Sequence, residues 1–167
     1  MIEPNHFGIP PWKSPEDWFQ VNFSFEHIGL RQWQKLQSAK KIADQIDNKL
    51  RAIDGDLEIL CDTTCPSCVD ICCKKATVWY DFTDLLYLYF SSARLPAGQI
   101  SRKADLSCSH LTPTGCELNR IMRPFICTWY ICPDQKDISS GQKLQNSIQN
   151  IQILRKQLEE EFICALG

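Results

Sequence analysis

The residues of this chain with the clearest chemical potential are its cysteines, of which there are ten in 167 residues. Five lie in the stretch CDTTCPSCVDICCKK, residues 61–75: Cys61, Cys65, Cys68, Cys72 and Cys73. Four more follow further along the chain: Cys108, Cys116, Cys127 and Cys132. Cysteine thiolates bind zinc ions and iron–sulfur clusters. We therefore take these nine as candidate metal ligands, with Cys61 as the open case.

The first group contains a Cys-x-x-Cys turn, which can bring the thiolates of Cys65 and Cys68 to one metal. If a helix begins directly after Cys65, then Cys65, Cys68 and Cys72 share one helix face. Cys73 then points about 100° away and can serve a second metal or another edge of a cluster. The spacing leaves open whether the ligands form one site or two.

The second group has the features of loops wrapped around a centre. The turn residues 112–115 can return Cys116 toward Cys108. Thiolates gathered in one place repel each other, and a bound metal supplies most of the compensating charge. Arg120 and Arg123 are candidates to donate hydrogen bonds to sulfur, although both could also be ordinary surface charges.

Two further residues near this pattern are interpreted as structural. His110 follows Cys108 closely and could bind zinc, but with so many thiols available we expect it to bond the backbone or a neighbouring side chain. Cys164 lies outside both groups, on the apolar side of a helical pattern, and we expect it to be a buried small hydrophobic residue.

The ordered combination of Cys65, Cys68, the Cys72–Cys73 pair, then CSHL, GCEL, RP and Cys127 resembles the YkgJ-type family of zinc- or iron-chelating domains, which is named for a CxxCxxCC motif. The resemblance covers residues 61–133 and extends to the cysteine-rich part of bacterial flagellin lysine methylases. It implies metal chelation, with zinc and iron–sulfur both considered. One departure is that three residues, not two, separate Cys68 from Cys72, which leaves open which of the first five cysteines are ligands.

The composition of the chain indicates the expected cellular compartment and argues against some kinds of partner. The segment of residues 1–19 has an acid and several prolines but no apolar core, so it does not read as a secretory signal, and no stretch reaches the roughly 18 apolar residues of a membrane span. The expected compartment is therefore the reducing cytoplasm, where clustered cysteines are more often metal ligands than disulfides. The net charge of −2 and the scattered basic residues indicate no nucleic-acid partner.

The surrounding segments predict a mostly α protein of one domain, residues 1–167. Residues 1–26 form an aromatic and proline-rich arm that we expect to pack over the body, the rival being an anchor for a partner or a membrane surface. Residues 27–54 and 139–164 each carry an apolar stripe with helical spacing. We expect these two long amphipathic helices to pack antiparallel, with the cysteine-rich module of residues 61–133 between them in sequence. Within it, residues 83–96 predict a short helix capped by Asp81 or Thr83.

The function predicted from these patterns is a metal-chelating protein with a cysteine-thiolate centre, either an iron–sulfur cluster or zinc. Alternatives are a redox or electron-transfer protein with a cycling cluster, and an adaptor whose fold is stapled by zinc. The spacing of Cys61, Cys65 and Cys68 is also that of radical S-adenosylmethionine enzymes, but the strand and helix repeats of that class are missing. No hydrolase or phosphate-loop pattern is present, so no catalytic residue is assigned. A protein partner is possible and unidentified.

Overall fold

The structure is a computed structural model that describes residues 10–69, 71–92, 95–136 and 141–167. Four helices make up most of it: α1 (Pro15–Gln32), α2 (Gln37–Thr64), α4 (Phe82–Ser92) and α7 (Gly141–Leu166). Between them lie η1 (Cys65–Ser67), α3 (Cys72–Lys75), β1 (Leu111–Thr112), β2 (Gly115–Cys116), η2 (Arg120–Met122), α5 (Ile126–Trp129) and α6 (Pro133–Lys136). The prediction of a mostly α fold is confirmed.

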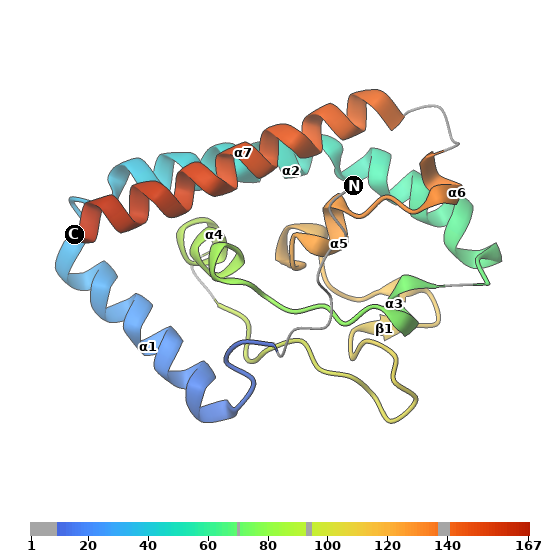
Figure 1. The fold of residues 1–167 in the computed structure, drawn as a ribbon, viewed down its shortest axis with the longest axis horizontal. Coiled ribbons are helices and arrows are strands. Elements are labelled where there is room, and N and C mark those ends of the chain that lie inside the picture. The colour runs from blue at the N-terminus through green and yellow to red at the C-terminus, as the bar shows by residue number, and fades with distance from the viewer. Residues whose placement is uncertain (1–9, 70, 93–94, 137–140) are drawn as a thin grey trace.

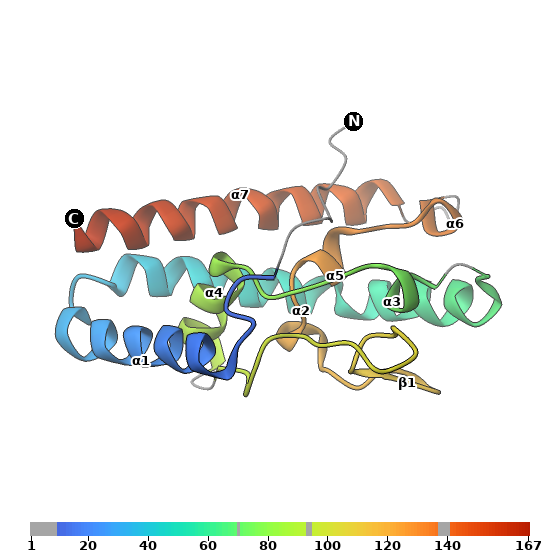
Figure 2. The ribbon, with the colours of Figure 1, turned by 60° about the horizontal axis from the view of Figure 1, so that its bottom comes forward.

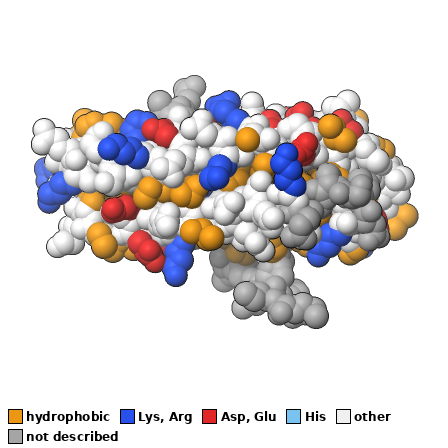
Figure 3. Space-filling view, turned by 90° about the horizontal axis from the view of Figure 1, so that it is seen from above, with side chains coloured by type: hydrophobic (Ala, Val, Ile, Leu, Met, Phe, Trp, Pro, Cys, Tyr) orange, Lys and Arg blue, Asp and Glu red, His pale blue; other side chains and the backbone are white. Residues whose placement is uncertain are grey.

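The two longest helices, α2 and α7, run antiparallel along one side of the molecule (Figures 1 and 2). The buried side chains of α7 follow the predicted stripe: Leu144, Ile148, Ile151, Leu158 and Phe162. Those of α2 follow it at Ala39, Ala43, Ile46, Leu50 and Ile53, and Leu57 and Leu60 extend it beyond the predicted end. Seen from above, the outer face of this pair carries scattered charges of both signs, with hydrophobic side chains in a line along its middle (Figure 3). Most of the stabilisation of both helices therefore comes from packing their apolar stripes.

The predicted bounds of the first long helix, 27–54, are wrong at both ends. The helix is interrupted between Gln32 and Gln37, where the backbone N–H groups of Lys35 and Leu36 both donate to the Gln32 carbonyl. At the other end, Gly55, where the helix was predicted to stop, is itself helical, and α2 continues to Thr64. A glycine in a helix costs about 1 kcal/mol, whereas stopping there would have exposed the buried side chains of Leu57 and Leu60.

Most of the described part of the predicted arm belongs to the helix α1, which continues past the arm to Gln32 and crosses the end of the molecule below α2 (Figure 1). Ser14 caps it by accepting a hydrogen bond from the Asp17 N–H at 3.0 Å, and Pro15 occupies the first helical position. Trp18 and Phe25 are buried, so the arm does pack over the body, although Phe19 remains 64% exposed. Residues 1–9 of the arm lie outside the described residues, as do Ser139 and Ser140, where the last helix was expected to begin.

The short helix predicted over residues 83–96 is α4, and Asp81 rather than Thr83 caps it. The Asp84 N–H donates to Asp81 Oδ1 at 2.7 Å, and the Asp81 N–H donates back to Asp84 Oδ2 at 3.1 Å. This reciprocal pair satisfies two backbone donors at the start of the helix. The helix itself packs against both α2 and α7, with Leu85, Leu86 and Leu88 in the core.

The cysteine-rich segments lie on one flank of the α2–α7 pair, toward the C-terminal end of α2 (Figures 1 and 2). A helix that begins directly after Cys65, considered above as one possibility, does not form; instead α2 ends in the η1 turn, and Cys68 has extended backbone angles. None of the helices in the described part of the chain has the length and apolar character needed to span a membrane.

Candidate metal centre

Four of the nine candidate ligands are carried by segments that the fold brings together from distant parts of the chain. They are Cys73 on α3, Cys108 in the loop before β1, Cys116 on β2, and Cys127 on α5. The Cys108 N–H donates to the Cys73 carbonyl at 2.8 Å, which joins the first cysteine group to the second. We call Cys73, Cys108, Cys116 and Cys127 the four-thiol group.

The predicted turn at residues 112–115 is confirmed and forms the hairpin of β1 and β2. Leu111 pairs with Cys116 across the two antiparallel strands, and Gly115 has a φ of 113°, which favours glycine. The Leu111 N–H donates to the Cys108 carbonyl at 3.0 Å, so the residues that carry Cys108 and Cys116 are locally fixed relative to each other.

The thiols of the four-thiol group act on one another electrostatically. The pKa of Cys127 is raised to about 12, chiefly by burial and then by the nearby Cys116 and Cys108, while Arg123 opposes the shift. The pKa of Cys73 is raised above its ordinary value, first by its hydrogen bond with Cys72 and then by burial, with Cys127 and Cys108 adding to the effect. Ionising several of these thiols together therefore requires a compensating positive charge.

Cys72 differs from its neighbour. The Cys73 side chain donates to the Cys72 sulfur, which lowers the pKa of Cys72 to about 6 although burial opposes the shift. The two adjacent thiols therefore titrate as a coupled pair, and ionisation of Cys72 disfavours ionisation of Cys73. Cys72 is also one of the charges that raise the pKa of Cys65, so the two thiols interact electrostatically.

Cys61 and Cys65 lie one helical turn apart at the end of α2, and the sulfur of Cys61 has two nitrogen donors. Arg120 Nη2 lies 4.0 Å and Gln135 Nε2 3.8 Å from Cys61 Sγ. Arg120 is only 3% exposed and also binds Asp54 Oδ1 through Nε at 3.0 Å. Burial raises the pKa of Cys65 to about 11, with neighbouring Cys61 as the next cause.

The two arginines therefore have different roles in the structure. Arg120 contacts a candidate ligand sulfur directly, whereas Arg123 donates to the Leu118 carbonyl at 2.8 Å and acts on Cys127 through its charge. Gln135 was not anticipated, because nothing in the pattern after Cys132 marks a glutamine as a donor to a sulfur so far away in sequence.

The loop around Cys108 is held by arginine and histidine side chains. Arg102 donates to the Lys75 carbonyl at 2.9 Å and to the Lys74 carbonyl at 3.3 Å, which ties the end of α3 to the strand-like segment before Cys108. His110 Nδ1 lies 2.8 Å from Glu117 Oε1, a side-chain partner within the same loop, as expected for a structural histidine.

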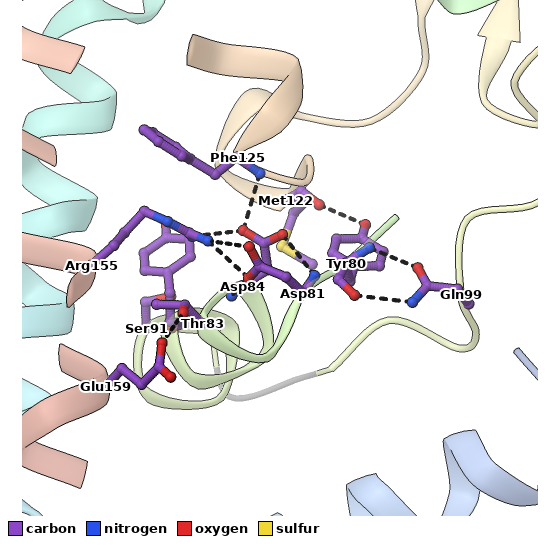
Figure 4. Close-up of polar contacts among 11 residues, drawn as sticks. Tyr80, Asp81, Thr83, Asp84, Ser91, Gln99, Met122, Phe125, Arg155 and Glu159 are labelled. Carbon is purple, nitrogen blue, oxygen red and sulfur yellow. Dashed lines mark hydrogen bonds and ion pairs between the residues drawn. The ribbon is translucent and has the colours of Figure 1, made fainter. Parts of the chain in front are cut away.

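A buried polar cluster positions the segment that leads into Cys127 (Figure 4). Asp84 Oδ1 accepts from the Phe125 N–H at 3.0 Å and from Arg155 Nη1 at 2.6 Å. The Tyr80 hydroxyl donates to the Met122 carbonyl at 2.7 Å, while the Tyr80 N–H donates to Gln99 Oε1 at 2.7 Å. Helices α4 and α7 therefore fix the backbone just before α5.

The donor chemistry suits a soft metal or cluster, since all nine candidates are thiols and all ten cysteines are free. Within the described residues, which include every cysteine, no three His, Cys, Asp or Glu side chains are arranged in a metal-binding geometry. The structure thus brings the ligand-bearing segments together without closing a coordination shell. One expectation is wrong: Cys164 is exposed rather than buried, because Leu158 and Phe162 occupy the inner face of α7.

Comparisons of the chain with protein-family models, with curated proteins and with solved structures found no match.

Proposed function

We propose that this protein chelates metal through a cysteine-thiolate centre that carries an iron–sulfur cluster or zinc. The observation that carries the proposal is the four-thiol group, Cys73, Cys108, Cys116 and Cys127, which comes from separate segments linked by the backbone bond between Cys108 and Cys73. In this group Cys108 and Cys127 raise the pKa of Cys73, and Cys108 and Cys116 raise the pKa of Cys127. Such crowded, partly buried thiols are stabilised as thiolate ligands when a cation is bound.

The surroundings of the group also support the proposal. Phe125 and Ile131 are buried and Trp129 packs against the core, so apolar side chains lie beside α5 and Cys127. An apolar shell of this kind shields a cluster from water and tunes its potential, which favours the iron–sulfur alternative. A thiolate-bound metal would supply electron storage if it is a cluster, or structural cross-linking if it is zinc. We place the protein in a reducing compartment such as the cytoplasm, where these thiols stay available.

The deciding experiment is anaerobic purification of the full chain followed by elemental analysis and an absorption spectrum. A brown product with labile sulfide identifies the cluster, and a colourless, zinc-loaded, iron-free product identifies zinc. Reversible bleaching of the brown product on reduction identifies the redox form of the function. Protein that contains no metal, and that takes up neither zinc nor iron with sulfide after reduction, contradicts the proposal.

Ligand assignment is tested by single Cys→Ser variants of the same preparation. Substitution of any member of the four-thiol group is expected to lower the metal content per chain. The matched control is Cys164→Ser, because Cys164 is an exposed thiol on the last turn of α7, outside the centre. Equal loss of metal in Cys164→Ser, or full loading in every member of the four-thiol group, rules out the assignment.

A further inference from the structure

The sulfur of Cys61 is the focus of two buried nitrogen donors that come from separate elements. Arg120 reaches it from η2 and Gln135 from α6, and both side chains are almost completely buried. Two buried N–H donors thus converge on one sulfur, which accepts a hydrogen bond from each. These donors distinguish Cys61 from a cysteine that serves only as a small apolar packing residue.

The orientation of the Gln135 amide is set by its other contacts. Its Oε1 accepts from the Cys132 N–H at 3.3 Å, so Nε2 is the atom that faces α2. From there Nε2 donates to Thr64 Oγ1 at 3.3 Å and to Cys61 Sγ at 3.8 Å. The amide therefore connects the backbone of the second cysteine group to the end of α2.

Three more thiols belong to the same stretch of chain as Cys61. Cys65 follows four residues later, as the C-cap of α2 and the first residue of η1, and Cys61 and Cys72 both raise its pKa. The Cys68 N–H donates to the Cys65 carbonyl at 3.3 Å, which is the tight Cys-x-x-Cys turn that can bring two thiolates to one metal. Cys72 begins α3 next to Cys73, and the two thiols are hydrogen-bonded to each other. If Cys72 and Cys73 served different sites, those sites would meet at this pair.

We propose that the cysteines form two metal sites rather than one: the four-thiol group, and a second site of Cys61, Cys65, Cys68 and Cys72 in which Arg120 and Gln135 donate hydrogen bonds to the Cys61 thiolate. The proposal rests on the proposed function and specifies how its ligands divide. The second site takes a soft divalent cation or a cluster, since all four donors are thiolates. The positive charge of Arg120 reduces the net negative charge of that site.

The test is a Co²⁺ titration of the reduced, metal-free full chain under argon, followed by the thiolate-to-cobalt absorption. Wild-type protein is expected to bind two equivalents. Cys61→Ser and Cys108→Ser are each expected to bind one, because each variant removes a ligand from a different site. One equivalent in wild type that is lost in both variants overturns the division into two sites and leaves the proposed function standing. No binding by wild type overturns both.

The donors to Cys61 are tested with variants that keep every thiol. Gln135→Leu and Arg120→Lys are expected to lower only the affinity for the second equivalent of Co²⁺, by about 10- to 100-fold. Asp54→Asn is the matched control, because it removes the ion pair of Arg120 but leaves its contact with sulfur. If Asp54→Asn lowers the affinity for the second equivalent of Co²⁺ as much as Arg120→Lys does, Arg120 acts only by stabilising the fold. In that case the proposal that it donates to the Cys61 thiolate is wrong. Far-UV circular dichroism of each variant, measured on the same samples, excludes unfolding as the cause.

Discussion

Arg155 of α7 donates from Nη1 to Asp84 Oδ1 at 2.6 Å, at a position where both side chains are almost entirely buried (Figure 4). Its Nη2 donates to both carboxylate oxygens of Asp81, at 2.8 and 2.9 Å. The guanidinium also lies 4.6 Å from the centre of the Phe125 ring. One arginine thus joins α7, the cap of α4 and the segment that precedes Cys127.

Replacing Arg155 with methionine is expected to lower the free energy of unfolding by about 3–5 kcal/mol, because it leaves two carboxylates without their cation and one of them is buried. Urea unfolding measures the change. The control is Lys156→Ala, which removes an exposed pair with Glu160 on the same helix and is expected to change stability by less than about 1 kcal/mol. Equal effects of the two variants would show that the buried pair adds nothing.

The pH dependence of stability should show the burial of Asp84, which raises its pKa from 3.8 to about 6 although Arg155 opposes the shift. The folded chain then binds a proton to Asp84 more readily than the unfolded chain does. The stability contributed by this proton is present below about pH 4 and is lost as the pH rises through 6. Relative to Asp84→Asn, wild type should lose about 3 kcal/mol of stability between pH 4 and pH 7, at about 1.4 kcal/mol per pKa unit.

Unfolding curves of wild type and Asp84→Asn across this pH range measure the difference, and the other titrating groups cancel in the comparison. Two curves that stay parallel from pH 4 to pH 7 would mean that burial does not shift Asp84. A difference that grows in the opposite direction would mean that Arg155 outweighs burial and keeps Asp84 ionised.

Two glycines in helices give opposite predictions for the same substitution. A Cβ at Gly29 would lie 1.6 Å from the Tyr89 hydroxyl, whereas a Cβ at Gly55 meets nothing within 4 Å. Gly29→Ala is therefore expected to destabilise the fold by about 1–3 kcal/mol by forcing α1 away from α4. Gly55→Ala should stabilise it by about 0.5–1 kcal/mol, because alanine loses less backbone entropy in the middle of α2. Thermal unfolding of both variants tests the pair, and the prediction is falsified if Gly55→Ala destabilises.

Removal of the proposed metal is expected to unfold the region of residues 61–133 while part of the α2–α7 pair persists. Thiolate-bound metal is worth on the order of 10 kcal/mol to the folding of small sites. The apolar stripes that include Leu50 and Ile151 pack without the sulfurs, so their amides should keep protection from hydrogen exchange. Hydrogen exchange before and after addition of a strong chelator measures the protection of each region. A melting curve that the chelator leaves unchanged would show that the metal has no structural role.

Regular periodicity was enough to predict the two long helices and the start of α4. The stripe from Ala39 to Ile53 is buried as its spacing predicts, and Asp81 caps α4 because its side chain and that of Asp84 satisfy each other's backbone donors locally. Such features depend on residues close together in sequence, so the local pattern contains the information.

The helix bounds were predicted less well because the decisive interactions are distant in sequence. No proline or glycine lies between Gln32 and Gln37, yet the helix ends there, while Trp18 of α1 donates to the distant Pro96 carbonyl at 2.9 Å. Conversely, Gly55 is a local stop signal that the buried side chains beyond it override.

The types of the residues at the candidate centre could be listed from the sequence, but not their arrangement. Nine thiols and two arginines were evident, and the turn at residues 112–115 indicated how Cys116 is returned. Only the tertiary structure decides that Arg120 rather than Arg123 faces a sulfur, that Gln135 joins it, and that Arg155 is buried on α7. The packing of the helices determines which charged and hydrogen-bonding side chains meet. That packing depends on the whole core rather than on any local sequence pattern.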